Sequence, residues 1–207
     1  MDHRHDMAAA SAAMTWRVIA RGDGWSVNEY FCGAGPGDPP AEERHENVTI
    51  AAVVGGSFQY RGDSGEALLY PGSLLLGNAG TCYECGHDHG AGDHCVGFHF
   101  APDYFEEIAA SAAGSYRFRF PAPVLAASRE LTSSAVDAET MARGGDPIAM
   151  EELSARLVEV VLATVSGTGR STAAPSARDQ RRIAACCVIS RRIPTSRSSL
   201  PTSPPSP

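Results

Sequence analysis

The sequence predicts a mainly β domain, an antiparallel sandwich or barrel, followed by helices at its C-terminal end. Between residues 15 and 100 the chain is divided into short apolar segments separated by glycine-rich turns. Several of these segments alternate apolar and polar residues, which is the pattern of a strand with one buried face. After residue 101 the apolar residues recur at helical spacing instead. These observations place the strands first and the helices last.

The first two predicted strands, residues 15–21 and 25–32, are joined by Gly-Asp-Gly and form a hairpin. Residues 33–40 are rich in Gly and Pro and are expected to form a loop. Further strands are expected at residues 47–54, 57–61, 66–70, 73–78, 81–85 and 94–100.

The first helix is expected to begin at Pro102, because the missing N–H of proline has no cost at a helix N-terminus. A short strand is predicted at residues 116–120 and a second helix at residues 128–143.

A last helix is expected to begin after the capping residue Asp146 and to run to Val165. Its apolar residues, among them Leu153, Leu157 and Val161, form a broad stripe that needs a covering surface. This stripe either caps the sheet or pairs with the same helix of a second subunit.

The pattern divides the chain into a disordered lead-in at residues 1–14, one folded domain at residues 15–166, a linker at residues 167–177 and a terminal segment at residues 178–207. The terminal segment begins with a short Arg-rich helical stretch and continues as a disordered tail rich in Ser, Pro and Arg.

Charge is unevenly distributed along the chain. The whole chain carries −7, residues 175–207 carry +5, and the remainder therefore carries −12. Such an acidic body is poorly suited to binding nucleic-acid phosphates. No apolar stretch is long enough to span a bilayer and no signal peptide is recognisable, so we expect a cytoplasmic protein without a membrane partner.

Three stretches carry a family resemblance: V-T-I-A-A-V-V-G-G-S-F-Q-Y-R, L-Y-P-G-S-L-L-L-G-N-A-G and C-Y-E-C-G-H-D-H-G-A-G-D-H-C-V-G-F-H-F-A-P-D-Y-F-E-E-I-A. With the helices that follow, this part of the chain resembles the N-terminal domain of AraC-type transcription regulators. The resemblance implies a cupin-like antiparallel β-barrel (a double-stranded β-helix) that senses a small-molecule effector. It also implies an α-helical hairpin that forms a homodimer.

AraC-type regulators continue into a domain of two helix-turn-helix units, and R-D-Q-R-R-I-A-A is similar to the start of that domain. Only 29 residues follow Arg178 in the 207-residue chain, whereas a domain needs about 50 or more. We therefore expect the DNA-binding domain to be truncated or frameshifted. DNA is an expected partner only where an intact C-terminal domain is present.

The densest group of metal-ligating residue types is the pattern C-x-x-C-x-H-x-H-x-x-x-x-H-C, which runs from Cys82 to Cys95. Thiolates and imidazoles are the ligands that Zn²⁺ favours. Cys82 and Cys85 would point to opposite faces of a strand. The candidate zinc ligands are therefore Cys85, His87, His89 and Cys95. The alternatives are that the cysteines are small buried hydrophobic residues, or that the thiols act as a redox sensor.

A small barrel can enclose one small molecule. The candidate pocket residues are Phe58, Tyr60, Tyr83, Phe98 and His99. His45 is a further candidate partner for a ligand or metal. The alternatives are that the aromatic residues only form core and that His99 is a hydrogen-bonded structural residue.

The sequence does not predict an enzyme, because it contains no G-x-S-x-G, Walker or H-E-x-x-H motif. Two other functions stay open beside effector sensing. One is a metal-dependent cupin enzyme, and the other is a metal or redox sensor that uses the Cys/His loop.

Overall fold

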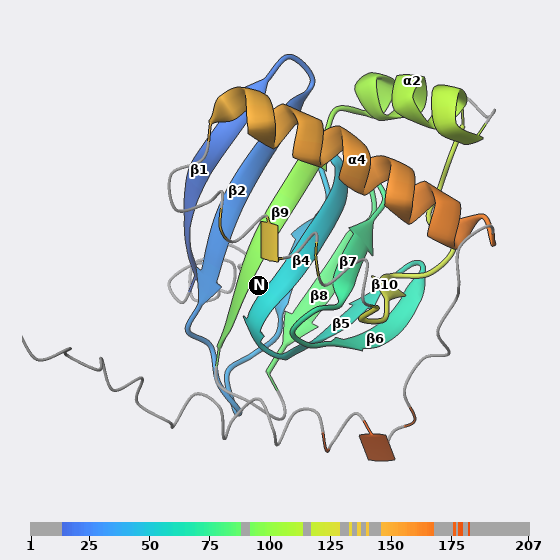
Figure 1. Ribbon diagram of the computed structural model, residues 1–207. Coiled ribbons are helices and arrows are strands. Elements are labelled where there is room, and N and C mark those ends of the chain that lie inside the picture. Colours follow the sequence, from blue (N-terminus) through green and yellow to red (C-terminus); the bar gives the residue numbers. More distant parts are fainter. Residues whose placement is uncertain are drawn as a thin grey trace, which may run out of the picture.

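The computed structural model describes residues 14–87, 92–113, 117–128 and 146–167, together with positions 133, 136, 137, 140, 176, 178, 179 and 182. Within these residues the chain forms two antiparallel sheets and two long helices (Figure 1). The strands of the larger sheet lie in the order β1 (Met14–Gly22), β2 (Trp25–Cys32), β9 (Asp93–Phe100), β4 (Val48–Gly56), β7 (Leu74–Gly77) and β10 (Val124–Leu125). The strands of the smaller sheet lie in the order β3 (Ala41–Arg44), β8 (Cys82–Gly86), β5 (Phe58–Gly62) and β6 (Gly65–Leu69).

The mainly β fold with later helices is confirmed, but the single closed barrel is wrong for the described residues. Strand pairing stops at β1 and β10 in the larger sheet and at β3 and β6 in the smaller one. The two sheets therefore lie face to face as separate layers, and side chains from both sheets line the space between them.

The predicted β1–β2 hairpin and the next six predicted strands are present, with ends shifted by one or two residues. Sequence analysis missed β3, whose residues Ala-Glu-Glu-Arg lack the apolar pattern of a strand. The predicted strand at residues 116–120 is wrong for its described residues, 117–120. There the side chain of Asn78 takes the place of a neighbouring strand: its Nδ2 donates to the carbonyl oxygen of Phe120 at 3.0 Å, and its Oδ1 accepts from the Phe120 N–H at 2.8 Å.

Two helices cover the outer face of the larger sheet. They are α2 (Pro102–Ala113) and α4 (Pro147–Val165), and α4 begins as predicted, with Asp146 Oδ1 accepting from the N–H of Ile148 at 3.1 Å. Figure 1 shows α4 crossing the strands of this sheet with α2 beside it. Of the predicted helix at residues 128–143, positions 133, 136, 137 and 140 are helical and most other positions lie outside the described residues.

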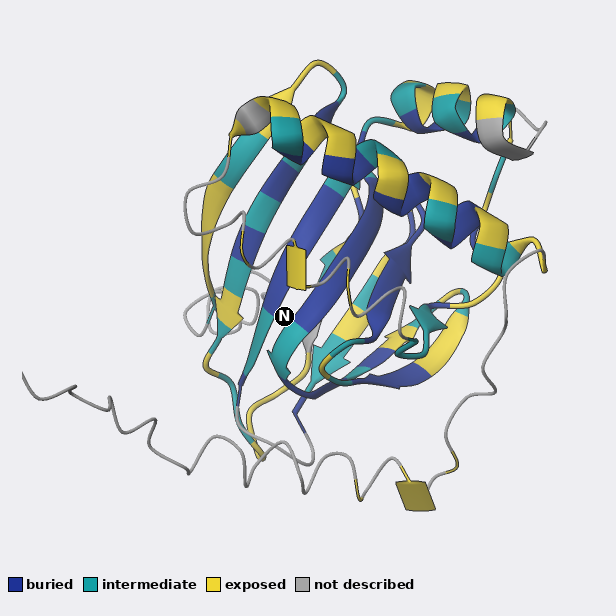
Figure 2. Cartoon of the chain, in the orientation of Figure 1, coloured by how far each residue is buried: buried dark blue, intermediate teal, exposed yellow. Residues whose placement is uncertain are grey.

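The stripe of Leu153, Leu157 and Val161 packs inward. These side chains are at most 2% exposed and belong to the core between α4 and the larger sheet, as the buried inner side of α4 shows in Figure 2. Capping of the sheet, one of the two alternatives for this stripe, is thus what the structure shows. The three residues therefore cannot form a subunit contact without leaving the core, and the homodimer stays a prediction.

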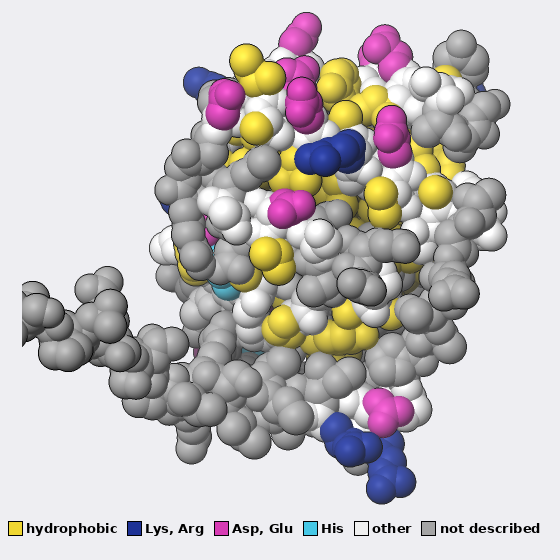
Figure 3. Space-filling view, viewed as in Figure 1, with side chains coloured by type: hydrophobic (Ala, Val, Ile, Leu, Met, Phe, Trp, Pro, Cys, Tyr) yellow, Lys and Arg dark blue, Asp and Glu magenta, His cyan; other side chains and the backbone are white. Residues whose placement is uncertain are grey.

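The outward side of α4 is polar and includes the exposed residues Glu151, Glu152 and Glu159. Acidic side chains are scattered over the helix-covered face of the molecule in Figure 3, with few basic ones among them. Within the described part of the chain, no helix is both long enough and apolar enough to cross a membrane.

The larger sheet has two different faces because side chains alternate along each strand. On β9, Val96, Phe98 and Phe100 are buried beneath the helices. The intervening residues Cys95 and His99 point to the space between the sheets. The same strands therefore build the core on one face and the candidate site on the other.

Candidate functional site

A cavity of about 680 Å³ lies between the two sheets. The strand β2 contributes Ser26, Asn28, Tyr30 and Cys32, which are alternate residues, and β9 contributes Asp93, Cys95 and His99. Residues of β3, β5 and β8 line the opposite wall. A cavity of this size lies within the range of small-molecule sites in proteins.

His45, which follows β3, forms one polar centre of the cavity. Its ring stacks on Tyr83 with 4.1 Å between centroids, and its Nε2 lies 3.1 Å from the hydroxyl of Tyr60. The hydroxyl of Tyr83 donates to Glu43 Oε2 at 2.6 Å. Burial, with a smaller effect from His99, lowers the pKa of His45 to about 4, so this imidazole is neutral at pH 7. A Cβ on Gly77 would collide with the ring, so glycine is needed for this close approach.

His99 forms the second polar centre, and its hydrogen bonds have a definite direction. Asn28 Nδ2 donates to the Tyr30 hydroxyl at 3.1 Å, and that hydroxyl lies 2.8 Å from His99 Nε2. Thr49 Oγ1 donates its one proton to the carbonyl oxygen of Asn47 at 3.3 Å, so it accepts from His99 Nδ1 at 3.2 Å. His99 Nε2 is then the acceptor for the Tyr30 hydroxyl. Burial lowers the pKa of His99 to about 4, so the imidazole is neutral at pH 7, as this chain of hydrogen bonds requires.

Asn28 has an unused acceptor in the cavity wall. Among the described residues, its Oδ1 is the one buried side-chain nitrogen or oxygen without a hydrogen-bond partner. A buried polar atom without a partner costs roughly 1–3 kcal/mol of stability.

One end of the cavity, here called the floor group, is formed by Cys32, His87 and Asp93. One ligating atom from each lies within 4.8 Å of the other two. Cys32 and Asp93 are brought together because they are directly opposite in the β2–β9 pair. His87 follows β8, and its Nε2 is 2.8 Å from Asp93 Oδ2. Burial lowers the pKa of His87, but hydrogen bonds to Asp93 and Cys32 outweigh it and raise the pKa to about 9.

Two further thiols line the cavity beside the floor group. Cys95 Sγ donates to Asp93 Oδ1 at 3.3 Å, and Cys85 lies on β8 across the cavity. Burial, followed by the charge of Asp93, raises the pKa of both Cys85 and Cys95 well above the usual value. Both are therefore neutral thiols at pH 7 and not activated nucleophiles.

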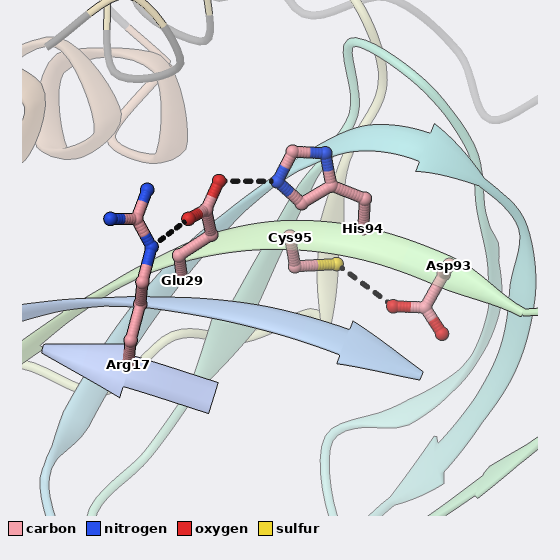
Figure 4. Close-up of polar contacts among 5 residues, drawn as sticks. All are labelled: Arg17, Glu29, Asp93, His94 and Cys95. Carbon is pink, nitrogen blue, oxygen red and sulfur yellow. Dashed lines mark hydrogen bonds and ion pairs between the residues drawn. The ribbon is translucent and has the colours of Figure 1, made fainter. Parts of the chain in front are cut away.

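His94, next to Cys95, belongs to a different group on the helix side of the sheet. Glu29 Oε1 lies 2.9 Å from His94 Nε2, and Glu29 Oε2 accepts from Arg17 Nε at 2.6 Å. Figure 4 shows Glu29 between Arg17 and His94, and Cys95 directed instead towards Asp93. His94 also stacks on Phe31 with 4.3 Å between the ring centroids. This group ties β1, β2 and β9 together and does not reach the cavity.

The structure places only some of the candidate pocket residues in the wall of the cavity. Phe58, Tyr83 and His99 line the cavity, and Tyr60 lies behind the lining, bonded to His45. Phe98 is wrong as a pocket residue, because it alternates with His99 and is buried on the helix side of the sheet.

The candidate zinc ligands are only partly brought together. His87 belongs to the floor group, while Cys85 and Cys95 line the cavity beside it. His89 lies outside the described residues. Sequence analysis missed Cys32 and Asp93. Strand alternation places Cys32 on the same face as Tyr30, but its pairing with Asp93 depends on the β2–β9 register, which the sequence does not show.

The floor group is also the one cluster of His, Cys, Asp or Glu in the described residues compact enough to hold a metal ion. His45 and His99 are therefore not joined with a carboxylate in a metal centre of the His-and-Glu type that the alternative of a cupin enzyme requires.

No protein-family model matches the chain, and the comparison with curated proteins finds no match. Solved structures that are similar to part of the chain include cupin-superfamily proteins. One is a cupin superfamily protein from Desulfitobacterium hafniense DCB-2, with 14% identity over 42% of this chain and 77% of that chain and a TM-score of 0.36. Another is the Cupin_2 domain of an XRE family transcriptional regulator from Enterobacter cloacae, with 14% identity over 42% of this chain and 97% of that chain and a TM-score of 0.37. A third is a cupin domain from Bordetella pertussis Tohama I, with 14% identity over 42% of this chain and 93% of that chain and a TM-score of 0.34.

Proposed function

We propose that this chain binds a small organic molecule between its two sheets and acts as the effector-sensing domain of an AraC-type transcription regulator. The observation that carries the proposal is the cavity of about 680 Å³ whose walls hold two neutral imidazoles and a buried, unpartnered amide oxygen. We propose binding and not catalysis, because the thiols of Cys85 and Cys95 are neutral and both imidazoles have structural hydrogen bonds.

The chemistry of the lining restricts the effector. Stacked Tyr83 and His45 offer a flat apolar surface. Four carboxylates line the cavity, from Asp38, Glu43, Glu46 and Asp93. Only Arg44 and the protonated His87 oppose them, which leaves a net charge of −2 on the lining. The effector is therefore a neutral or cationic molecule, and not an anion.

A sensing role also needs a path from the cavity to the rest of the molecule. Here β2, β4 and β9 carry cavity residues on one face and the residues beneath α4 on the other. His99 in the cavity and Phe98 in the core are consecutive on β9. A ligand that shifts β9 therefore changes the surface on which α4 packs, and α4 is the helix that the AraC resemblance assigns to dimerisation. DNA enters this proposal only where an intact helix-turn-helix domain follows.

The proposal is tested with a fragment set in which each aromatic skeleton is present as an amide, an amine and a carboxylate, such as 4-hydroxybenzamide, 4-hydroxybenzylamine and 4-hydroxybenzoate. Backbone amide chemical shifts of the full chain report binding. We expect shifts at β2 and β9 with amides or amines and none with the matching carboxylates. The variant Ala51→Leu, which fills the cavity without removing a polar group, abolishes these shifts, whereas Cys82→Ser on the exposed face of β8 leaves them unchanged. Carboxylates that bind as well as amides, or the lack of any cavity binder, would overturn the proposal.

A further inference from the structure

We propose that Cys32, His87 and Asp93 bind one zinc ion at the end of the cavity, through one sulfur, one nitrogen and one oxygen ligand, with the fourth coordination position directed into the cavity. This inference goes beyond effector binding, because the ion needs no organic molecule in the cavity. It also differs from the zinc site that the Cys/His motif predicts, since two of its three ligands lie outside that quartet.

The positions of the three side chains are fixed by three different elements of the fold. Cys32 and Asp93 are opposite partners at the ends of β2 and β9, and both strands are held along their length by the pairing in between. His87 is attached directly to the end of β8. The side chains of His87 and Asp93 are only 4% and 10% exposed. Their atoms are therefore placed before any ion binds, which lowers the cost of ordering them around one.

The spacing of the ligating atoms suits a tetrahedral ion after a small movement. The three atoms lie within 4.8 Å of one another. Zinc bonds of about 2.0–2.3 Å require neighbouring ligand atoms to be about 3.5 Å apart. Side-chain rotations that shift each atom by about 1 Å or less close this gap, and the strand backbones can stay in place.

The donor set indicates zinc and not magnesium or calcium. A thiolate and an imidazole are soft or intermediate ligands, whereas magnesium and calcium take oxygen ligands almost alone. With three protein ligands, the fourth position is open, which is the arrangement of zinc sites that accept a water or a ligand atom. All three residues line the cavity, so an effector in the cavity can occupy that position.

Cys95 positions the carboxylate ligand. Its thiol donates to Asp93 Oδ1 at 3.3 Å, while the other oxygen, Oδ2, faces His87. Partners that hold a metal-ligating carboxylate in this way are typical of zinc sites. Serine at this position keeps a hydrogen-bond donor, so Cys95→Ser is expected to retain the ion, whereas loss of Cys32 removes a ligand.

The test uses the purified full chain, stripped of metal by a chelator and kept in a non-thiol reductant. It is titrated with Co²⁺ as an optical probe, and Zn²⁺ affinity is then measured by competition with a chromogenic chelator. We expect one equivalent of Co²⁺ to bind with the near-ultraviolet absorption of a cobalt–thiolate bond, and one equivalent of Zn²⁺ to displace it. This band disappears in Cys32→Ser and persists in Cys82→Ser, which removes an exposed cysteine outside the group. Asp93→Asn and His87→Gln each weaken Zn²⁺ binding by about tenfold or more.

The contradicting results are equally definite. A thiolate band that survives in Cys32→Ser would show that a different cysteine is the ligand, and a band that disappears in Cys95→Ser would assign the thiolate to Cys95. Either result would overturn the ligand set. Zinc affinity that is equal in Asp93→Asn and Cys82→Ser would overturn the site. Amide chemical shifts of α4, on the opposite face of the larger sheet from the group, show whether each variant is folded. Fragment binding to the metal-free protein tests the cavity separately, so the zinc site and the effector proposal can fail independently.

Discussion

Tyr30 on β2 and His99 on β9 are joined across neighbouring strands by a hydrogen bond of 2.8 Å between the phenol oxygen and Nε2. Their rings meet edge to face, with 5.8 Å between centroids. A Cβ on Gly97 would lie 2.9 Å from both side chains, so this glycine gives the pair its space. Together with Thr49, which lies 3.2 Å from Nδ1, Tyr30 occupies both ring nitrogens of His99.

The variant Tyr30→Phe removes the donor to His99 and the acceptor for Asn28. We expect it to lower the free energy of unfolding by about 1–3 kcal/mol, because two buried polar groups lose their partner. Urea unfolding measures the loss. Tyr70→Phe is the control, since Tyr70 is held by Ser73 through its backbone, and it should change stability by less than about 0.5 kcal/mol. Equal effects of the two variants would contradict the directed chain.

The stability of the domain should fall as the pH drops from 6.5 towards 4. His45 and His99 have folded-state pKa values of about 4, below the value of 6.5 in the unfolded chain. The unfolded state therefore binds more protons in this window, so stability is full above pH 6.5 and is lost towards pH 4. Each histidine contributes a slope of up to about 1.4 kcal/mol per pH unit.

Urea unfolding at several pH values between 4.5 and 7.5 measures this slope. The variant His99→Gln should reduce it, whereas Cys82→Ser should leave it as in the parent. If the free energy of unfolding depends on pH equally in His99→Gln and in the parent, the pKa of His99 is not lowered in the folded state. His87 acts in the opposite direction: its raised pKa of about 9 stabilises the fold at lower pH, and this stabilisation is lost as the pH rises through 9.

The variant Gly77→Ala should disturb His45. A new Cβ at this position meets the ring of His45, which is buried between Gly77 and Tyr83 and has little room to move. We expect a loss of about 1–3 kcal/mol in stability and a shift of the His45 ring proton resonances. Gly86→Ala is a matched control, because its Cβ would lie 3.9 Å from Pro40, an ordinary contact. His45 resonances unchanged in Gly77→Ala would refute the close approach.

The variant Leu157→Ala should destabilise the single subunit by about 2–5 kcal/mol, because it opens a cavity beneath α4. Ile148→Ala, at a residue 68% exposed on the same helix, should have almost no effect. Thermal unfolding measures the stability of both variants, and sedimentation measures their oligomeric state. Together they distinguish a core role of Leu157 from a role in a subunit contact. If a dimer dissociates in Leu157→Ala while the subunit stays folded, this residue belongs to the subunit interface.

Sequence reasoning works for features that depend on neighbouring residues. The alternation of β9, the Gly-Asp-Gly hairpin and the Asp146-Pro147 helix start are all local patterns, and each is found in the structure. It fails where the partner is distant. The residues of β3 become a strand only because β8 offers free hydrogen-bonding groups, and residues 117–120 are not a strand because Asn78 already occupies the backbone of Phe120.

The candidate site shows the same division. His87, Cys85 and Cys95 stand out in the sequence because they are close together in one motif. Cys32 is separated from Asp93 by 61 positions along the chain, and only the register of β2 against β9 makes them neighbours. Tyr30 and Thr49 join His99 for the same reason, and no local pattern distinguishes them from other strand residues.

The strict alternation of β9 has an evolutionary consequence. Loss or gain of a single residue within Asp93–Phe100 would turn the rest of the strand over. The imidazole and thiol side chains of the strand would then face the helices, and its phenylalanine side chains would fill the cavity. Point substitutions along this strand can accumulate one at a time, but selection should eliminate short insertions and deletions. The length of the strand is therefore expected to vary less among descendants than its amino-acid composition.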